Sequence, residues 1–205
     1  MTDNVLYLNQ GDFKFKDISK VSGVKGKKSW TTGVTMADIN ADGWLDIYVC
    51  YSGNGNLDSR RNELYINQGD LTFKEEAAAY GLDDPSNSTQ SLFFDFDKDG
   101  DIDLFVGGRS LPNRYPEADQ SYLLKNESKG NNVKFVSVQA ESLASLGMVT
   151  SSVWHDINQD GWIDLIVAGE LMPITILENQ KGKLVDKTEA YHLAKSHGRW
   201  SKILW

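Results

Sequence analysis

A nine-residue segment rich in aspartate occurs three times in the chain, and it constrains the fold more than any other feature. The copies cover residues 38–46, 95–103 and 156–164 and align without gaps, with Asp at positions 1, 5 and 9 and Gly at position 6. They recur about every 60 residues, and self-similarity at a fixed period indicates a repeat architecture. Short apolar runs lie on both sides of each copy. Such runs predict strands, so each segment predicts a loop that joins two strands.

A second repeated unit lies between these loops. Residues 6–12 read Leu-Tyr-Leu-Asn-Gln-Gly-Asp and residues 64–70 read Leu-Tyr-Ile-Asn-Gln-Gly-Asp, with weaker copies at 122–126 and 175–179. Asn and Gly tolerate the left-handed backbone of tight turns, and the alternating Phe and Lys residues that follow are typical of a half-exposed strand. Each unit therefore predicts a second hairpin.

Two hairpins per repeat give four strands, which predicts an all-β chain and favours a β-propeller. We expect a propeller fragment of about three and a half four-stranded blades, with the Asp-rich loops between strands 1 and 2 of each blade. The expected units are an outer hairpin over 4–18, blades over about 30–80, 89–140 and 150–190, and the first strand of a next blade over 200–205. A β-sandwich is the alternative, but it does not explain why one loop recurs at one place in every unit. Because open sheet edges invite pairing, such a fragment is expected to belong to a longer propeller or to self-associate.

The three loops are predicted to bind calcium, about three ions per chain. Ca²⁺ takes six to eight oxygen ligands, and side chains at positions 1, 3, 5 and 9 supply oxygen, while position 7 offers its backbone carbonyl. Gly at position 6 permits the sharp turn. By ligand charge, the second loop should bind most tightly. The expected ligands are Asp38, Asn40, Asp42, Trp44 and Asp46 in the first loop, Asp95, Asp97, Asp99, Asp101 and Asp103 in the second, and Asp156, Asn158, Asp160, Trp162 and Asp164 in the third.

Other interpretations of the loops fit less well. An EF-hand requires Glu at position 12, where this chain has Val49, Val106 and Val167. Mg²⁺ prefers octahedral sites with several waters, and softer metals prefer His or Cys. Metal-free Asx-rich turns remain the structural alternative, although carboxylates gathered in one small loop repel each other without a cation.

The loops match the signature D-x-[DN]-x-D-G-x-x-D, and the chain resembles FG-GAP/VCBS repeats, as in integrin α-subunit propellers. Segments 106–116, 146–150 and 167–174 further resemble bacterial proteins related to the ASPIC/UnbV and cartilage acidic protein group. The resemblance implies an extracellular, periplasmic or cell-surface location and a role in adhesion or binding. The N-terminus is polar, and no secretory signal is expected there.

The sequence shows no catalytic motif, so we do not expect an enzyme. His155 is expected to pack at a strand end, Arg109 and Arg114 lie in an insertion that is solvated or binds a ligand, and Cys50 is expected to be a buried small hydrophobe. A net charge of −8 disfavours nucleic-acid binding, and no apolar run is long enough to span a membrane.

Function follows as an expectation with one alternative. The first hypothesis is a calcium-stabilised scaffold for an unidentified protein or glycan ligand. The alternative is a lectin-like or glycan-processing accessory module, in which Trp44 and Trp162 stack on sugar rings if they are exposed; otherwise they pack against the neighbouring blade.

Overall fold

The structure is a computed structural model that describes residues 3–27, 29–130 and 132–203. Its strands form four separate antiparallel sheets. The two-stranded sheet pairs β1 (Tyr7–Asn9) with β2 (Phe15–Asp17). The next two contain β3 (Trp30–Ala37), β4 (Asp46–Ser52), β5 (Glu63–Asn67) and β6 (Phe73–Glu75), then β7 (Ser88–Phe94), β8 (Asp103–Gly108), β9 (Tyr122–Asn126) and β10 (Phe135–Ser137). The last contains β11 (Met148–His155), β12 (Asp164–Met172), β13 (Thr175–Asn179) and β14 (Leu184–Asp186), with β15 (Gly198–Arg199) added to β12.

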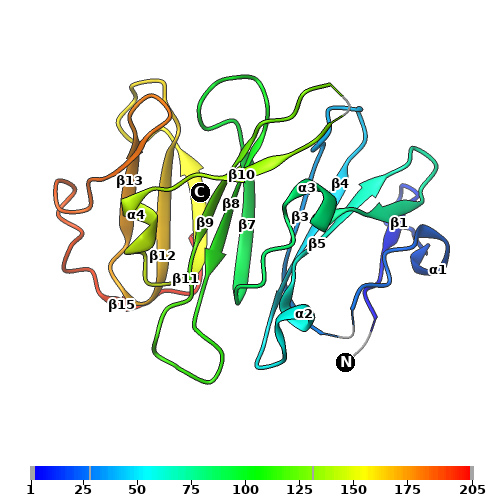
Figure 1. The fold of residues 1–205 in the computed structure, drawn as a ribbon, viewed down its shortest axis with the longest axis horizontal. Coiled ribbons are helices and arrows are strands. Elements are labelled where there is room, and N and C mark those ends of the chain that lie inside the picture. The colour runs from blue at the N-terminus through cyan, green and yellow to red at the C-terminus, as the bar shows by residue number, and fades with distance from the viewer. Residues whose placement is uncertain (1–2, 28, 131, 204–205) are drawn as a thin grey trace.

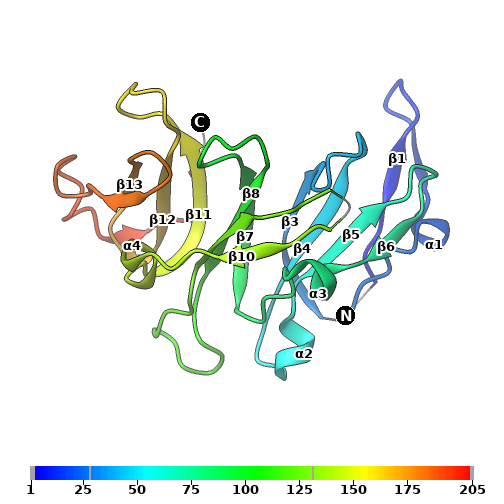
Figure 2. The same ribbon diagram turned by 45° about the horizontal axis from the view of Figure 1, so that its top comes forward.

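The predicted all-β class is confirmed. The sheets follow one another in chain order across the molecule, from β1 and β2 in blue to β13 in orange (Figure 1), and the turned view shows the same succession (Figure 2). Among the first strands of these sheets, β7 contacts both β3 and β11. This arrangement agrees with a β-propeller-like fold, and the described strands do not join into a closed sheet.

The second repeated unit forms the predicted hairpins. In each copy the residue just after the second strand of the hairpin donates its backbone N–H to a carbonyl near the start of the first strand, over 2.8–2.9 Å. The four donor–acceptor pairs are Ile18 to Leu6, Glu76 to Leu64, Val138 to Leu123 and Lys187 to Ile176. Single-turn helices that the sequence did not predict follow or precede the hairpins, at α1 (Ser19–Ser22), α2 (Leu57–Arg60), α3 (Ala77–Tyr80) and α4 (Glu141–Ala144).

The core lies between neighbouring sheets. Tyr48 and Leu64 of the first four-stranded sheet pack in one cluster with Leu104 of the second. Phe105 of the second packs in another with Leu165 of the third. Because side chains of facing sheets exclude water from each other, each sheet is stabilised by its neighbours. Cys50 is fully buried as predicted, and its burial raises the pKa of the thiol to about 12.

A threonine in each first strand links adjacent sheets. Each hydroxyl lies within hydrogen-bond distance of a carbonyl on strand 2 of its own sheet and of a carbonyl in the next segment along the chain: Thr32 contacts Cys50 and Ser88, Thr89 contacts Gly107 and Val149, and Thr150 contacts Ala168 and Trp200. The same contact therefore joins each of these sheets to the segment that follows it along the chain.

The C-terminal segment differs from the predicted strand over 200–205. Residues 200–203 are not in a strand, and residues 204–205 lie outside the described residues. The segment still lies against β11, because the Ile203 N–H donates to the Ser151 hydroxyl at 2.9 Å. The Thr150 contact gives Trp200 the place that Val149 has for Thr89, so Trp200 corresponds to the residue just before the repeated threonine.

Candidate metal centre

Each Asp-rich loop joins the first strand of a sheet to its second: β3 to β4, β7 to β8 and β11 to β12. The glycines at position 6 adopt the expected left-handed backbone, with φ of 90°, 97° and 86° for Gly43, Gly100 and Gly161. Position 4 is also left-handed, at Ala41, Lys98 and Gln159, with φ between 57° and 62°. This second left-handed residue is not predictable from the sequence pattern, because none of the three is a glycine.

The first aspartate of each loop closes the turn by accepting two backbone N–H groups. In the first loop, Asp38 Oδ1 accepts from Asp42 N at 3.0 Å and Oδ2 accepts from Gly43 N at 2.9 Å. Asp95 and Asp156 make the corresponding bonds in their own loops. Three independent copies of one bonding scheme indicate that the repeated sequence specifies one loop geometry.

Positions 3 and 5 lie side by side in the loop. Asn40 Nδ2 donates to Asp42 Oδ2 at 2.9 Å, and Asn158 Nδ2 donates to Asp160 Oδ2 at 3.0 Å. In the second loop the carboxylates of Asp95, Asp97 and Asp99 offer oxygens that all lie within 4.8 Å of one another. Asp101 is exposed, and its N–H donates to Asp99 Oδ1 at 3.1 Å.

The ninth residue is buried beneath each loop. Asp46, Asp103 and Asp164 are at most 1% exposed. Asp46 accepts from Ile39 N at 3.0 Å and from Asn67 N at 2.8 Å, and the other two make equivalent bonds. Burial raises the pKa of all three carboxyl groups, that of Asp46 to about 6 and that of Asp103 to about 7, despite these hydrogen bonds. The ninth carboxylate thus holds the loop onto the sheet through backbone donors.

The asparagine at the end of each third strand completes the frame. Asn67, Asn126 and Asn179 each donate Nδ2 to the carbonyl of loop position 8, at 3.1–3.2 Å. Asn179 Nδ2 also donates to Phe96 O of the neighbouring loop at 2.6 Å. From the sequence these asparagines are predicted only as hairpin residues. The asparagine is retained even in the weaker copies of the hairpin unit, at 122–126 and 175–179, and this retention is the sequence feature that indicates its role in holding the loop.

The loop residues fit a calcium ion better than a soft metal. Their side chains offer carboxylate and amide oxygens, and Ca²⁺ is a hard cation that takes oxygen ligands. In the second loop, Asp97 Oδ1 is buried and has no hydrogen-bond partner, so one acceptor is left without a donor.

The two loop tryptophans have different surroundings. Trp162 lies beneath Lys98 of the second loop, whose ammonium is 4.5 Å from the ring centroid and donates to Gly161 O at 2.6 Å. This contact between neighbouring loops is a cation–π interaction. Trp44 is 52% exposed.

Other residues considered in the sequence lie outside the loops. Arg109 forms an ion pair with Glu170 of β12, a residue that is 7% exposed, and so connects the second and third four-stranded sheets. Arg114 pairs with exposed Glu117 within its own loop. His155 ends β11 opposite Asp164, as expected for a residue at a strand end.

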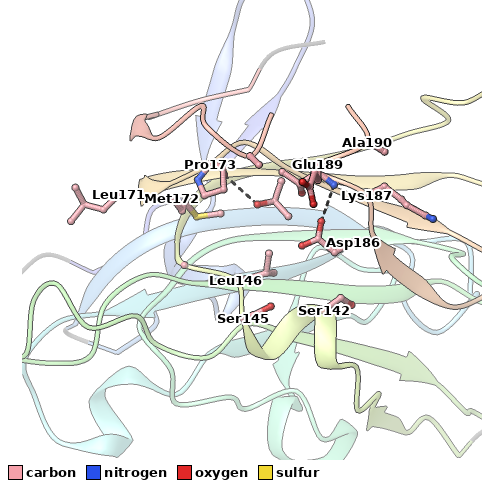
Figure 3. Close-up of a pocket in the computed structure, with 14 residues that line it drawn as sticks. Ser142, Ser145, Leu146, Leu171, Met172, Pro173, Asp186, Lys187, Glu189 and Ala190 are labelled. Carbon is pink, nitrogen blue, oxygen red and sulfur yellow. Dashed lines mark hydrogen bonds between the residues drawn. The ribbon is translucent and has the colours of Figure 1, made fainter. Parts of the chain in front are cut away.

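A cavity of about 740 Å³ lies between α4 and the segment after β14. Figure 3 shows Ser142, Ser145 and Leu146 across from the 186–190 segment, while Leu171 extends away from the other labelled side chains. Asp186 Oδ1 accepts from Thr188 N at 2.8 Å. The cavity lining contains no residue of the Asp-rich loops.

Comparisons with known proteins are consistent with the repeats. The model of the FG-GAP-like repeat family matches residues 2–49 and 51–106, just over half of the chain. Cartilage acidic protein 1 from Homo sapiens is 28% identical over 182 residues, which are 87% of this chain and 27% of that protein. The same protein from Mus musculus is also 28% identical, and that from Xenopus tropicalis 27%. The chain thus spans about a quarter of the length of these relatives.

Proposed function

Because the chain belongs to the FG-GAP-like repeat family, we propose that it is part of a calcium-binding β-propeller that acts as an extracellular or cell-surface binding scaffold. One observation carries the metal assignment: three loops repeat the same backbone bonds to an aspartate at position 1 and one at position 9. A plain turn needs one such side chain, whereas each of these loops places at least three carboxylates around one turn. A cation offsets the repulsion between these charges.

The proposed ions are structural, about three per chain. Positions 1, 3, 5 and 9 would supply side-chain oxygens and position 7 its backbone carbonyl, as the sequence predicts. The buried ninth carboxylate binds the loop to the neighbouring strand through its backbone bonds. A bound ion would therefore fix the connection between the first two strands of each sheet.

The proposed scaffold role and extracellular location are supported by the family match and by the propeller-like fold. The similarity to cartilage acidic protein 1 and to FG-GAP-like repeats favours an extracellular module. In the described residues no helix is long and apolar enough to cross a membrane. We propose binding as the role, and an unidentified protein or glycan as the partner; products from a panel of polysaccharides would overturn the non-enzymatic assignment.

Equilibrium dialysis with radioactive calcium tests the metal sites one at a time. Asp42→Asn, Asp99→Asn and Asp160→Asn each remove one charge from position 5 of one loop. Each variant should hold fewer ions than the unaltered chain at the same free calcium, and Asp12→Asn, an exposed aspartate outside the loops, should not. Equal calcium content in all four variants and the parent would overturn the assignment.

Glycan binding is the second candidate, and the exposure of Trp44 favours it. An exposed indole stacks on sugar rings, whereas Lys98 already covers a face of Trp162. A glycan array should therefore lose signal with Trp44→Ala and keep most of it with Trp162→Ala. Absence of signal from the parent protein across a broad array would remove this candidate.

A further inference from the structure

The three loops share one frame, but the side chain that reaches them from the third strand differs. The residue before the framing asparagine is Ile66, Lys125 or Glu178. Ile66 is buried in the core, and Glu178 Oε1 accepts from the Tyr191 hydroxyl at 2.8 Å. Only Lys125 brings a positive charge to its own loop at this position.

The Lys125 ammonium lies among the predicted metal ligands of the second loop. Its Nζ donates to Asp97 Oδ2 and lies 3.1 Å from Asp99 Oδ2. The Lys125 side chain is 29% exposed, and that of Asp97 is 16% exposed. Gly182 of the neighbouring sheet also approaches Asp97, because a Cβ on this glycine would lie 3.1 Å from Asp97 Cβ. The ion pair is therefore partly shielded from water. Charges attract each other more strongly in such surroundings than in bulk water.

The first and third loops have a different hydrogen-bond donor next to the carboxylate at position 5. Their third position is asparagine, whose amide donates to the fifth carboxylate. The second loop has Asp97 there, which adds a negative charge beside Asp99, and Lys125 replaces the missing amide donor. The additional carboxylate and the lysine thus compensate each other.

We propose that Lys125 is a tethered counter-cation that competes with Ca²⁺ for Asp97 and Asp99, so that the second loop binds calcium more weakly than the first and third. This inference rests on the proposed calcium binding of the loops. An ion that takes oxygens from both aspartates must displace the ammonium, which can swing toward water because its side chain is partly exposed. The order of affinities is then the reverse of the order expected from the number of carboxylates.

The test isolates the second loop. The double variant Asp42→Asn/Asp160→Asn weakens the first and third loops, and calcium binding to the rest is measured by calorimetry with and without Lys125→Met. Removal of the ammonium should raise the affinity of the second loop at least about tenfold, the scale on which one close charge shifts ion binding. Lys125→Arg keeps the charge and should leave the affinity low, whereas Lys125→Gln should raise it as Met does.

Lys134→Met is the matched control, because Lys134 is an exposed lysine in the connection between β9 and β10 and its loss changes the net charge equally. Equal affinities for the Lys125→Met and Lys134→Met proteins would overturn the role of Lys125 while leaving the calcium sites intact. A parent chain that takes up no calcium at any loop would instead overturn the proposed function. Near-ultraviolet circular dichroism of each variant verifies that it is folded. If the Lys125→Met protein is not folded, the comparison of Lys125→Gln, which removes the charge, with Lys125→Arg, which keeps it, takes its place.

Discussion

At the scale of single residues, the loops depend on side chains that bond to the backbone. Asn179 is fully buried and serves three partners: its Nδ2 contacts Phe96 O and Ile163 O, and its Oδ1 accepts from Gly182 N at 2.8 Å. Asn9 has the same place in the β1–β2 hairpin, where it is exposed, and within the described part of the chain its side chain accepts only from Gly11 N. Asparagine at the same position of the motif is therefore expected to contribute much more to stability in one copy than in the other.

Asn179→Ala should destabilise the protein by about 2–4 kcal/mol, because it leaves buried polar groups without partners. Asn9→Ala is the matched control and should cost less than about 1 kcal/mol. The free energy of unfolding, measured by denaturant titration in chelator so that calcium does not contribute, checks both. Equal effects of the two substitutions would contradict the role given to Asn179.

At the scale of elements, the molecule is held together by contacts between first strands. Thr89 illustrates them, since its hydroxyl lies 3.2 Å from Gly107 O in its own sheet and 2.8 Å from Val149 O in the next. The threonines at this position are visible in the sequence, six residues before each loop. Their hydrogen bonds join residues far apart in the chain, so the sequence alone did not indicate what they bind.

Thr89→Val replaces the hydroxyl by a methyl group of similar size and should destabilise the protein by about 1–2 kcal/mol, because the carbonyls of Gly107 and Val149 lose the single hydroxyl donor that lies between them. Thr89→Ser retains the hydroxyl and should recover most of that loss. Thermal unfolding followed by circular dichroism compares the two variants. A valine variant as stable as the serine variant would show that this contact does not link the sheets.

The elements also show what the sequence predicts and what it does not. Loops, hairpins and the all-β class follow from local patterns, because hydrophobic alternation and left-handed turn residues act over a few positions. The Lys125–Asp97 pair joins residues that are 28 positions apart, and the Asn179–Phe96 bond joins residues 83 apart. Contacts of this kind depend on how strands and sheets are placed, which the repeat pattern specifies only in outline.

At the scale of the whole molecule, calcium is proposed to couple the repeats. Lys98 of the second loop contacts Gly161 and Trp162 of the third, so two of the Asp-rich loops are in direct contact across a sheet boundary. Adjacent sheets also share their cores. In a repeat architecture, stability is the sum of units and of their interfaces, so an ion that stiffens one loop also stabilises its neighbour.

Removal of calcium should therefore lower the stability of the entire chain. A ligand that binds only the folded state adds about 2.7 kcal/mol per site when its concentration is a hundredfold above its Kd. Thermal unfolding in excess calcium and in excess chelator should differ by several degrees or more, and calcium should restore the higher midpoint. Identical midpoints under both conditions would mean that calcium does not stabilise this fold.

The most direct test of the central claim is a calorimetric titration of chelator-stripped protein with calcium. The account predicts about three ions per chain, with two sites of higher affinity from the first and third loops and one of lower affinity from the second. The absence of both heat and calcium uptake would contradict the account, and the Asp-rich loops would then be turns held by their own hydrogen bonds within an FG-GAP-like repeat.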